Sequence, residues 1–324
     1  MLTIQDSIAS LHLGEATLYE GLTVFPLFSE SSQEKDYLTL DEALEQGQGR
    51  VTEVSESGSV PTLRFENLSD KRVLLVDGDE LIGAKQNRII NLTIMVAAHT
   101  GIDIPVSCVE AGRWRHESRE FKSEKRAMMA RSRANKSASV SASMKQAGSR
   151  RSDQGEVWED VAVYSRTLNV DSPTGSMSDI YDGHEAALDN YKKAFKAGTN
   201  QVGALFAVNG RIQGLEVFDS SVTFANYLER LVSSYAITRL AERGEVEFSA
   251  TPDATGFLDR VGRASTECFE ALGEGDDLRL SGDGLAGGAL RTEDRIYHLV
   301  VFDLQNPNNK SGHRAESYRR RRPH

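Results

Sequence analysis

The sequence predicts an α+β fold, with an antiparallel β-sheet or sandwich core into which helices are inserted. Apolar, β-branched runs gather in the first third of the chain and return near its end, whereas helical periodicity comes mainly between them. Neither a phosphate-loop lysine motif nor a dinucleotide-binding glycine pattern in a strand-then-helix context is present. We therefore expect no regular strand–helix alternation of the doubly wound kind.

The first expected strands lie before residue 80. Residues 16–28 are rich in Leu, Val, Tyr and Phe around a turn at Gly21. The alternating run 62–66 is separated by turn residues from the apolar run 73–76, which predicts a hairpin between the two. A short helix is expected near residues 41–47.

Two more antiparallel pairs are expected further along. Residues 89–98 and 102–109 are β-branched runs separated by His-Thr-Gly, which is typical of paired strands. Residues 203–208 and 215–218 flank an Asn209-Gly210 turn, which is a strong short-range hairpin signal.

Two helices carry the clearest periodicity. Large apolar residues recur at helical spacing in residues 188–195 and again in residues 224–240. Asp219 or Ser220 is expected to cap the start of the second helix, with Gly244 just past its end. Residues 295–304 crowd apolar side chains together and predict a last buried strand.

Charge is distributed unevenly along the chain. Residues 111–151 hold twelve lysines or arginines against three glutamates, a local net charge of +9, whereas the whole chain carries −10. Most of this stretch has few large apolar residues to bury, so we interpret it as a flexible, basic insertion. The expected organisation is a β-rich half (1–110), that insertion (111–154), helices and returning strands completing the same domain (155–309), and a disordered basic tail (310–324).

Composition and termini exclude several classes. The N-terminus lacks a signal-peptide pattern and no run of about 18 apolar residues occurs, so we expect a cytoplasmic protein with no membrane association. Cys108 and Cys268 should then be thiols. The seven histidines show no paired zinc spacing, so no metal ligands are assigned and no cofactor is specified.

The candidate site lies in two polar segments, residues 77–88 and 105–114, each at the end of an expected strand. Loops at strand ends can present functional groups together, so the site requires that these two segments meet. Glu80 and Glu110 could act as acid and base, since a carboxyl held protonated by another's charge supplies both roles. Together with neighbouring aspartates, they could alternatively hold a hard divalent cation or simply be solvated turn residues.

Cys108 is a candidate nucleophile because nearby basic residues would favour its thiolate, although free cysteine is commonly a buried apolar residue. The candidate ligand-binding residues combine cations for phosphate or carboxylate, amides for polar edges, and an aromatic ring for stacking. They are Lys85, Gln86, Asn87, Arg88, Arg113 and Trp114.

The motifs at residues 37–44, 77–88 and 105–114 resemble one family, the bacterial ARG and rhodanese-phosphatase-superfamily-associated protein domain. The likeness continues through Gln154-Gly155-Glu156-Val157-Trp158 and the segment 181–195, covering about residues 14–240. The family is named for its association with ADP-ribosylglycohydrolases and rhodanese-type phosphatases. The resemblance implies a theme of ADP-ribose or NAD-derived metabolites but assigns no catalytic residue.

These observations favour a protein that binds or processes a phosphorylated, nucleotide-like ligand, without deciding whether it is an enzyme. One alternative is a non-catalytic partner or scaffold of an operon-encoded enzyme, with the polar segments as its interface. A second is nucleic-acid binding through the basic stretch, which we favour least because interleaved aromatics and recognition motifs are lacking.

Overall fold

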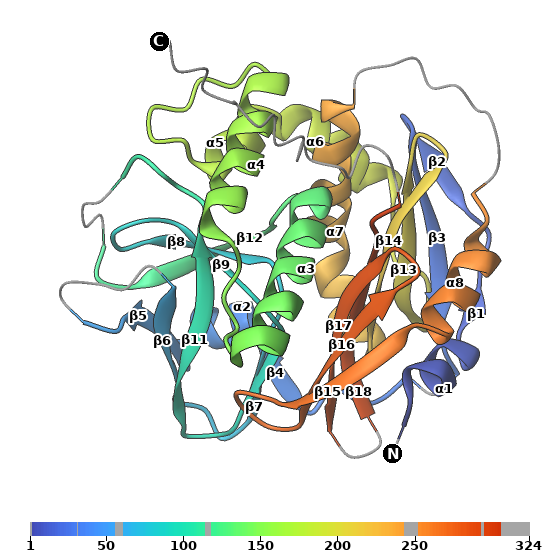
Figure 1. The fold of residues 1–324 in the computed structure, drawn as a ribbon, viewed down its shortest axis with the longest axis horizontal. Helices are drawn as coiled ribbons and strands as arrows, with labels where there is room; N and C mark the ends of the chain where they lie inside the picture. Colours follow the sequence, from blue (N-terminus) through green and yellow to red (C-terminus); the bar gives the residue numbers. More distant parts are fainter. Residues whose placement is uncertain are drawn as a thin grey trace, which may run out of the picture.

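The computed structural model describes residues 2–30, 32–55, 61–113, 118–242, 252–292 and 295–305. These residues form a large antiparallel sheet on one side and a smaller, curled sheet on the other, with helices α3 (Ala130–Ala147) and α7 (Ser221–Ala241) between them (Figure 1). The expected α+β class, with antiparallel sheets and inserted helices, is confirmed. No helix within the described ranges is long and apolar enough to cross a membrane.

The large sheet has nine strands, and every pairing in it is antiparallel. One face packs on α7, and the other is covered by α1 (Ile4–Ala9) and α8 (Ala254–Gly262). Its strands are β1 (His12–Leu13), β2 (Thr17–Tyr19), β3 (Leu22–Phe28), β13 (Gln201–Val208), β14 (Arg211–Phe218), β18 (Arg295–Asp303), β17 (Leu285–Thr292), β16 (Asp276–Gly282) and β15 (Ser265–Glu270).

Two of the expected hairpins in this sheet are confirmed. β2 and β3 pair around Gly21, and β13 and β14 pair around Asn209 and Gly210. Asn209 and Gly210 have φ of 49° and 74°, the left-handed values that a tight hairpin turn requires and that Asn and Gly tolerate. β18 is the expected last strand.

The smaller sheet has six strands that curl into a barrel. In order they are β12 (Phe121–Ala127), β8 (Asp79–Gly83), β9 (Arg88–Ile90), β11 (Gly101–Cys108), β6 (Thr62–Asn67) and β5 (Gly49–Glu53). An antiparallel bridge between Thr52 and Glu120 joins the edge strands and closes the barrel. Alternate residues face inward, where Val51, Leu63 and Leu81 belong to one apolar cluster.

A third, three-stranded sheet corrects one expected pairing. β7 (Arg72–Leu75) pairs with β10 (Ile94–Val96) and, in parallel, with β4 (Tyr37–Thr39), whereas β6 pairs with β5 and β11. The expected hairpin between residues 62–66 and 73–76 is therefore wrong, because β6 and β7 are neighbours in sequence but lie in different sheets. The run 89–98 is likewise split into β9 and β10, although β9 does pair antiparallel with β11 as expected.

The helices predicted from the clearest apolar periodicities are confirmed. α2 (Leu40–Glu45), α6 (Glu185–Ala194) and α7 lie where expected, and Ser220 is the N-cap of α7. Gly244 and the tail 310–324 lie outside the described residues. Two further helices, α4 (Gln154–Thr167) and α5 (Met177–Asp182), cover the barrel side near α3.

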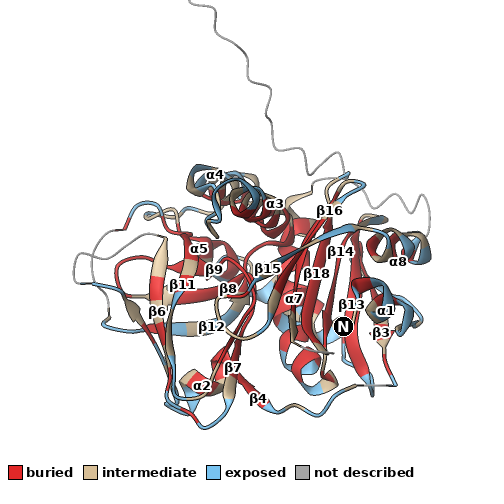
Figure 2. Cartoon of the chain, turned by 60° about the horizontal axis from the view of Figure 1, so that its bottom comes forward, coloured by how far each residue is buried: buried red, intermediate tan, exposed pale blue. Residues whose placement is uncertain are grey.

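The interpretation of residues 111–154 as a flexible insertion is corrected by the structure. Residues 121–127 form the barrel strand β12. Half of the residues of α3 are buried, and the helix lies between the two sheets (Figure 2). Small Ser and Ala side chains let α3 approach the strands closely. Its cations Arg133 and Lys136 are fully buried because Asp77 and Glu216 neutralise them.

Candidate functional site

The two polar segments meet at one end of the barrel. β9 pairs with β8 on one side and with β11 on the other, so the β8–β9 connection lies beside the end of β11. Asn87 N donates to Glu110 Oε2 at 3.0 Å, Gln86 Nε2 donates to Glu110 O at 2.9 Å, and Val109 N donates to Asn87 O at 3.1 Å. At this end of the barrel, β5, β8 and β11 end and β6, β9 and β12 begin. We call it the barrel mouth.

Arg113 holds the two segments together. Its Nε donates to Glu110 Oε1 at 2.8 Å, and its Nη1 donates to the carbonyl of Ala84 at 2.9 Å. Ala84 has a φ of 40°, which a non-glycine residue adopts at a cost, so the clamp stabilises a strained turn. These contacts position the loop, and the ligand contact of Arg113 stays a prediction.

Glu110 is ionised within this clamp. Burial disfavours its charged form, but hydrogen bonds from Arg113, Asn87 N and Thr174 outweigh burial and lower the pKa of Glu110. All of these contacts are to the chain itself. Glu110 is thus a fixed acceptor around which the loop is built.

Arg88 has unused hydrogen-bonding capacity. It is fully buried, and its Nη1 donates to Gln86 Oε1 at 3.2 Å and to Asn87 O at 3.3 Å. Its Nε and Nη2 are buried and have no partner among the described residues. Burial lowers the pKa of Arg88, and the acidic groups Cys108 and Glu53 only partly offset this.

Cys108 lies opposite Arg88 in the β9–β11 register, on the inner face of the barrel. Its side chain is fully buried and its thiol donates to the carbonyl of Glu110 at 3.4 Å. Burial raises the pKa of Cys108 despite the nearby guanidinium. The group is therefore a thiol at neutral pH, because desolvation outweighs the basic neighbour. This direction disfavours the nucleophile role, which stays an untested prediction.

Glu80 faces the other side of the barrel wall from Arg88, since β8 pairs Leu81 with Arg88. Ser178 Oγ donates to its Oε1 at 2.9 Å, whereas Oε2 is buried and has no partner within the described ranges. Burial raises the pKa of Glu80 to about 7, against a smaller opposing effect of Arg126. Glu80 and Glu110 do not hydrogen-bond to each other, and Asn87 and Ser178 link them.

The remaining sequence candidates are mostly enclosed. Lys85, Gln86 and Asn87 expose 8% of their surface or less, and Trp114 lies outside the described residues. Asp77 pairs with Lys136, and Asp79 with Arg230. In the part of the chain that the structure describes, no three His, Cys, Asp or Glu side chains group as metal ligands.

Sequence reasoning missed Glu53, which shares the inward face of β5 with Val51. Both of its carboxylate oxygens are buried, and no described residue is their hydrogen-bond partner. A signal was present in the sequence: the alternation that directs Val51 inward also directs a charged residue inward two positions later.

A comparison with known families shows which of them is similar to the chain. Residues 10–302 match the ARG and Rhodanese-Phosphatase-superfamily-associated Protein domain. The chain belongs to this family. The match begins before β1 and ends within β18, so it extends beyond the motifs near residues 14–240 to include the last strands of the large sheet. No curated protein and no solved structure shows a significant match to the chain.

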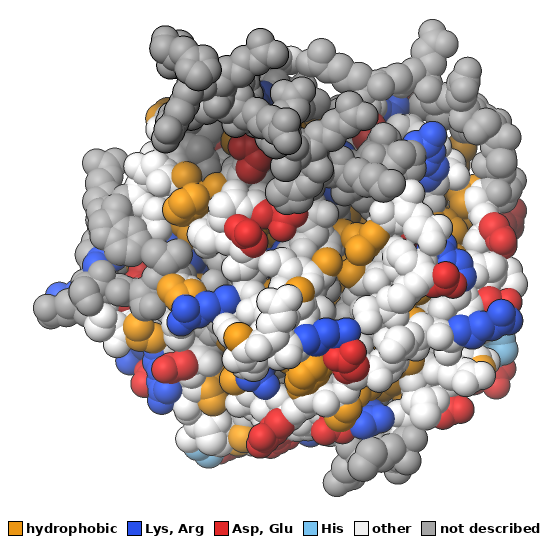
Figure 3. Space-filling view, in the orientation of Figure 1, with side chains coloured by type: hydrophobic (Ala, Val, Ile, Leu, Met, Phe, Trp, Pro, Cys, Tyr) orange, Lys and Arg blue, Asp and Glu red, His pale blue; other side chains and the backbone are white. Residues whose placement is uncertain are grey.

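The basic stretch of this family member is largely neutralised within the fold. On the face seen in Figure 3, cationic and anionic side chains are interspersed. Among the described residues of the stretch 111–151, six cations form ion pairs with acids, which reduces the charge available to nucleic-acid phosphates. They are Arg113, Lys125, Arg126, Arg133, Lys136 and Lys145.

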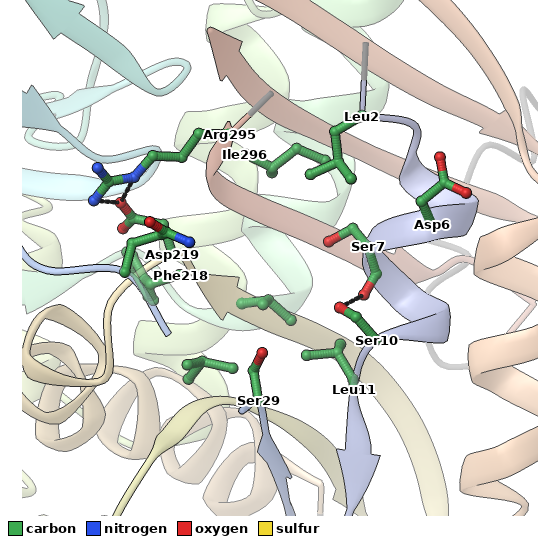
Figure 4. Close-up of a pocket in the computed structure, with 13 residues that line it drawn as sticks. Leu2, Asp6, Ser7, Ser10, Leu11, Ser29, Phe218, Asp219, Arg295 and Ile296 are labelled. Carbon is green, nitrogen blue, oxygen red and sulfur yellow. Dashed lines mark hydrogen bonds and ion pairs between the residues drawn. The ribbon is translucent and has the colours of Figure 1, made fainter. Parts of the chain in front are cut away.

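A cavity of about 220 Å³ lies on the other side of this family domain, between α1 and the large sheet (Figure 4). Ser7 and Ser10 line it from α1, and Arg295 donates to Asp219 Oδ2 at 2.5 Å on the opposite wall. Tyr37 also donates to Asp219, at 2.6 Å. Asp219 and Arg295 thus neutralise each other, unlike Arg88, which makes this cavity the weaker candidate.

Proposed function

We propose that this protein binds a phosphorylated, ADP-ribose-like nucleotide at the barrel mouth. The observation that carries the proposal is the buried guanidinium of Arg88, two nitrogens of which have no acceptor in the described part of the chain. The family name supports the ligand class, because it associates the domain with ADP-ribosylglycohydrolases. Barrel mouths and strand-end loops are frequent ligand sites.

Energetics favour a ligand-binding role for Arg88 over a structural one. Burying a charge without a partner costs several kcal/mol, roughly 3–5 kcal/mol where a buried pair is broken. Native proteins keep few such groups, and those they keep commonly serve function. Oxygen atoms of a bound ligand would offset this cost, since the guanidinium offers parallel donors to oxygen acceptors.

The same burial argues against a docking surface built from the β8–β9 segment. A stable protein interface covers on the order of 800 Å² per partner, and Lys85 and Arg88, which expose 8% of their surface and none, add almost nothing to such an area. A partner enzyme remains supported by the family name alone. It would have to contact another surface.

Thermal denaturation with and without ADP-ribose tests the proposal. We expect ADP-ribose to raise the stability of the wild-type protein, by about 2.7 kcal/mol at 100 times its Kd. Arg88→Met should abolish this shift, because it removes the guanidinium donors that the ligand would engage. The ligand-free unfolding transition, recorded in the same measurement, shows whether the variant is folded, so a lost shift in a folded variant reports lost binding.

Arg64→Met is the matched control, because Arg64 lies in the same barrel with an exposed ion pair to Asp103. It should keep the full ligand shift. A folded wild-type protein whose melting temperature does not respond to ADP-ribose, ADP or AMP would refute the proposal.

A further inference from the structure

Glu53 and Arg88 face each other across the interior of the barrel. β5 and β9 are three strands apart in a closed order of six, so they lie on opposite walls. Both side chains point inward, Glu53 with Val51 and Arg88 with Cys108. Their charges interact, since Glu53 opposes the effect of burial on the pKa of Arg88.

The two groups do not satisfy each other. Both oxygens of Glu53, and Nε and Nη2 of Arg88, are buried and have no hydrogen-bond partner among the residues that the structure describes. Four polar atoms of complementary kind, two acceptors and two donors, therefore border the same interior. Leaving such atoms without partners disfavours the empty barrel, so an occupant that met all four would bind with a large gain.

The chemistry of these atoms restricts the occupant. It must accept hydrogen bonds from Arg88 and also donate hydrogen bonds to Glu53. A phosphate oxygen accepts but does not donate, and it would be repelled by the carboxylate. A hydroxyl does both, and two adjacent hydroxyls can bridge the two side chains.

We propose that the barrel interior seats the vicinal diol of a ribose, whose hydroxyls donate to Glu53 and accept from Arg88. This inference rests on the proposed function and deepens it, because it assigns the sugar to the interior. The phosphate of the same ligand then lies outward at the barrel mouth, away from Glu53. The ligand class is a ribose phosphate, as found at the end of an ADP-ribose molecule.

Two sugar phosphates of equal charge test the inference. Ribose 5-phosphate and 2-deoxyribose 5-phosphate differ by the 2-hydroxyl. Calorimetric titration of the full chain with each sugar phosphate therefore measures what the vicinal diol contributes to affinity. We expect wild-type protein to prefer ribose 5-phosphate by about 10- to 100-fold, the range expected for a hydrogen bond to a charged group. Glu53→Gln should reduce the preference to less than about threefold, because the lost charge weakens that bond.

Glu66→Gln is the control, because Glu66 lies on the neighbouring strand β6 in a half-exposed pair with Arg50. It should retain the wild-type preference. The wild-type comparison needs no variant, so a failure of Glu53→Gln to fold leaves the test intact.

The outcomes separate the two proposals. If ADP-ribose binds but the two sugar phosphates bind equally, or neither binds, the diol assignment is overturned and the nucleotide site stands; the interior then holds water only. If no nucleotide binds, the proposed function fails and the assignment fails with it.

Discussion

At the scale of single residues, Glu80 shows how strongly the barrel wall alters a carboxyl group. The side chain is fully buried at the start of β8, and burial raises its pKa from 4.5 to about 7. A carboxyl that binds its proton more tightly in the folded state favours folding at low pH. That contribution is lost as the pH rises from the pKa of the carboxyl in the unfolded state through its pKa in the folded state.

We therefore expect Glu80→Gln to be more stable than the wild-type protein above pH 8, by on the order of 3 kcal/mol, with the difference shrinking toward pH 5. Urea unfolding at several pH values between 5 and 8 measures this. Glu159→Gln, on the exposed face of α4, should show no such pH dependence. A difference between Glu80→Gln and wild type that stays constant with pH would contradict the burial argument.

Residue positions in the site were partly predictable from sequence. That residues 77–88 and 105–114 meet followed from their places at the ends of expected strands, and the structure confirms it. Which side chains remain without partners was not predictable. Arg88 and Arg113 look alike in the sequence, but only tertiary contacts saturate Arg113 and leave two donors of Arg88 unused.

At the scale of elements, α3 shows why composition misled. Its Ser, Ala, Lys and Arg residues are typical of a solvated segment. The partners that allow its cations to be buried are distant in sequence: Asp77 is 59 residues from Lys136, and Glu216 is 83 residues from Arg133. By contrast, α7 was predictable because its own periodic apolar residues carry the signal.

Two lysines of α3 provide a matched test of its burial. Lys136 is fully buried and donates to Asp77 and to the carbonyls of Ile90 and Asn91, whereas Lys145 forms a partly exposed pair with Glu267. Lys136→Met should cost roughly 3–5 kcal/mol of unfolding free energy, because Asp77 loses its lysine partner and the two carbonyls lose this donor. Lys145→Met should cost about 0–1 kcal/mol. Equal effects in denaturant unfolding would show that α3 is not packed as described.

At the scale of the whole molecule, α3 connects the barrel side to the large sheet. Arg133 donates to the carbonyl of Asp77 at 3.1 Å, in the segment between β7 and β8, and pairs with Glu216 of β14. Its guanidinium also lies over the ring of Phe302 in β18, 5.3 Å from the ring centre. One apolar cluster includes residues from both sides, so the two sheets should unfold together.

Arg133→Met tests that coupling. Removing the guanidinium leaves Glu216 with His298 as its remaining charged or polar partner and takes a donor from Asp77 O, which should cost roughly 3–5 kcal/mol. Because Arg133 contacts both sides, amide hydrogen exchange should accelerate together in β9 of the barrel and β14 of the large sheet. Arg166→Met, in an exposed pair on α4, should alter neither strand. Faster exchange in only one of the two strands would mean that the sheets are stabilised independently, and that ligand binding at the barrel mouth would leave the large sheet unaffected.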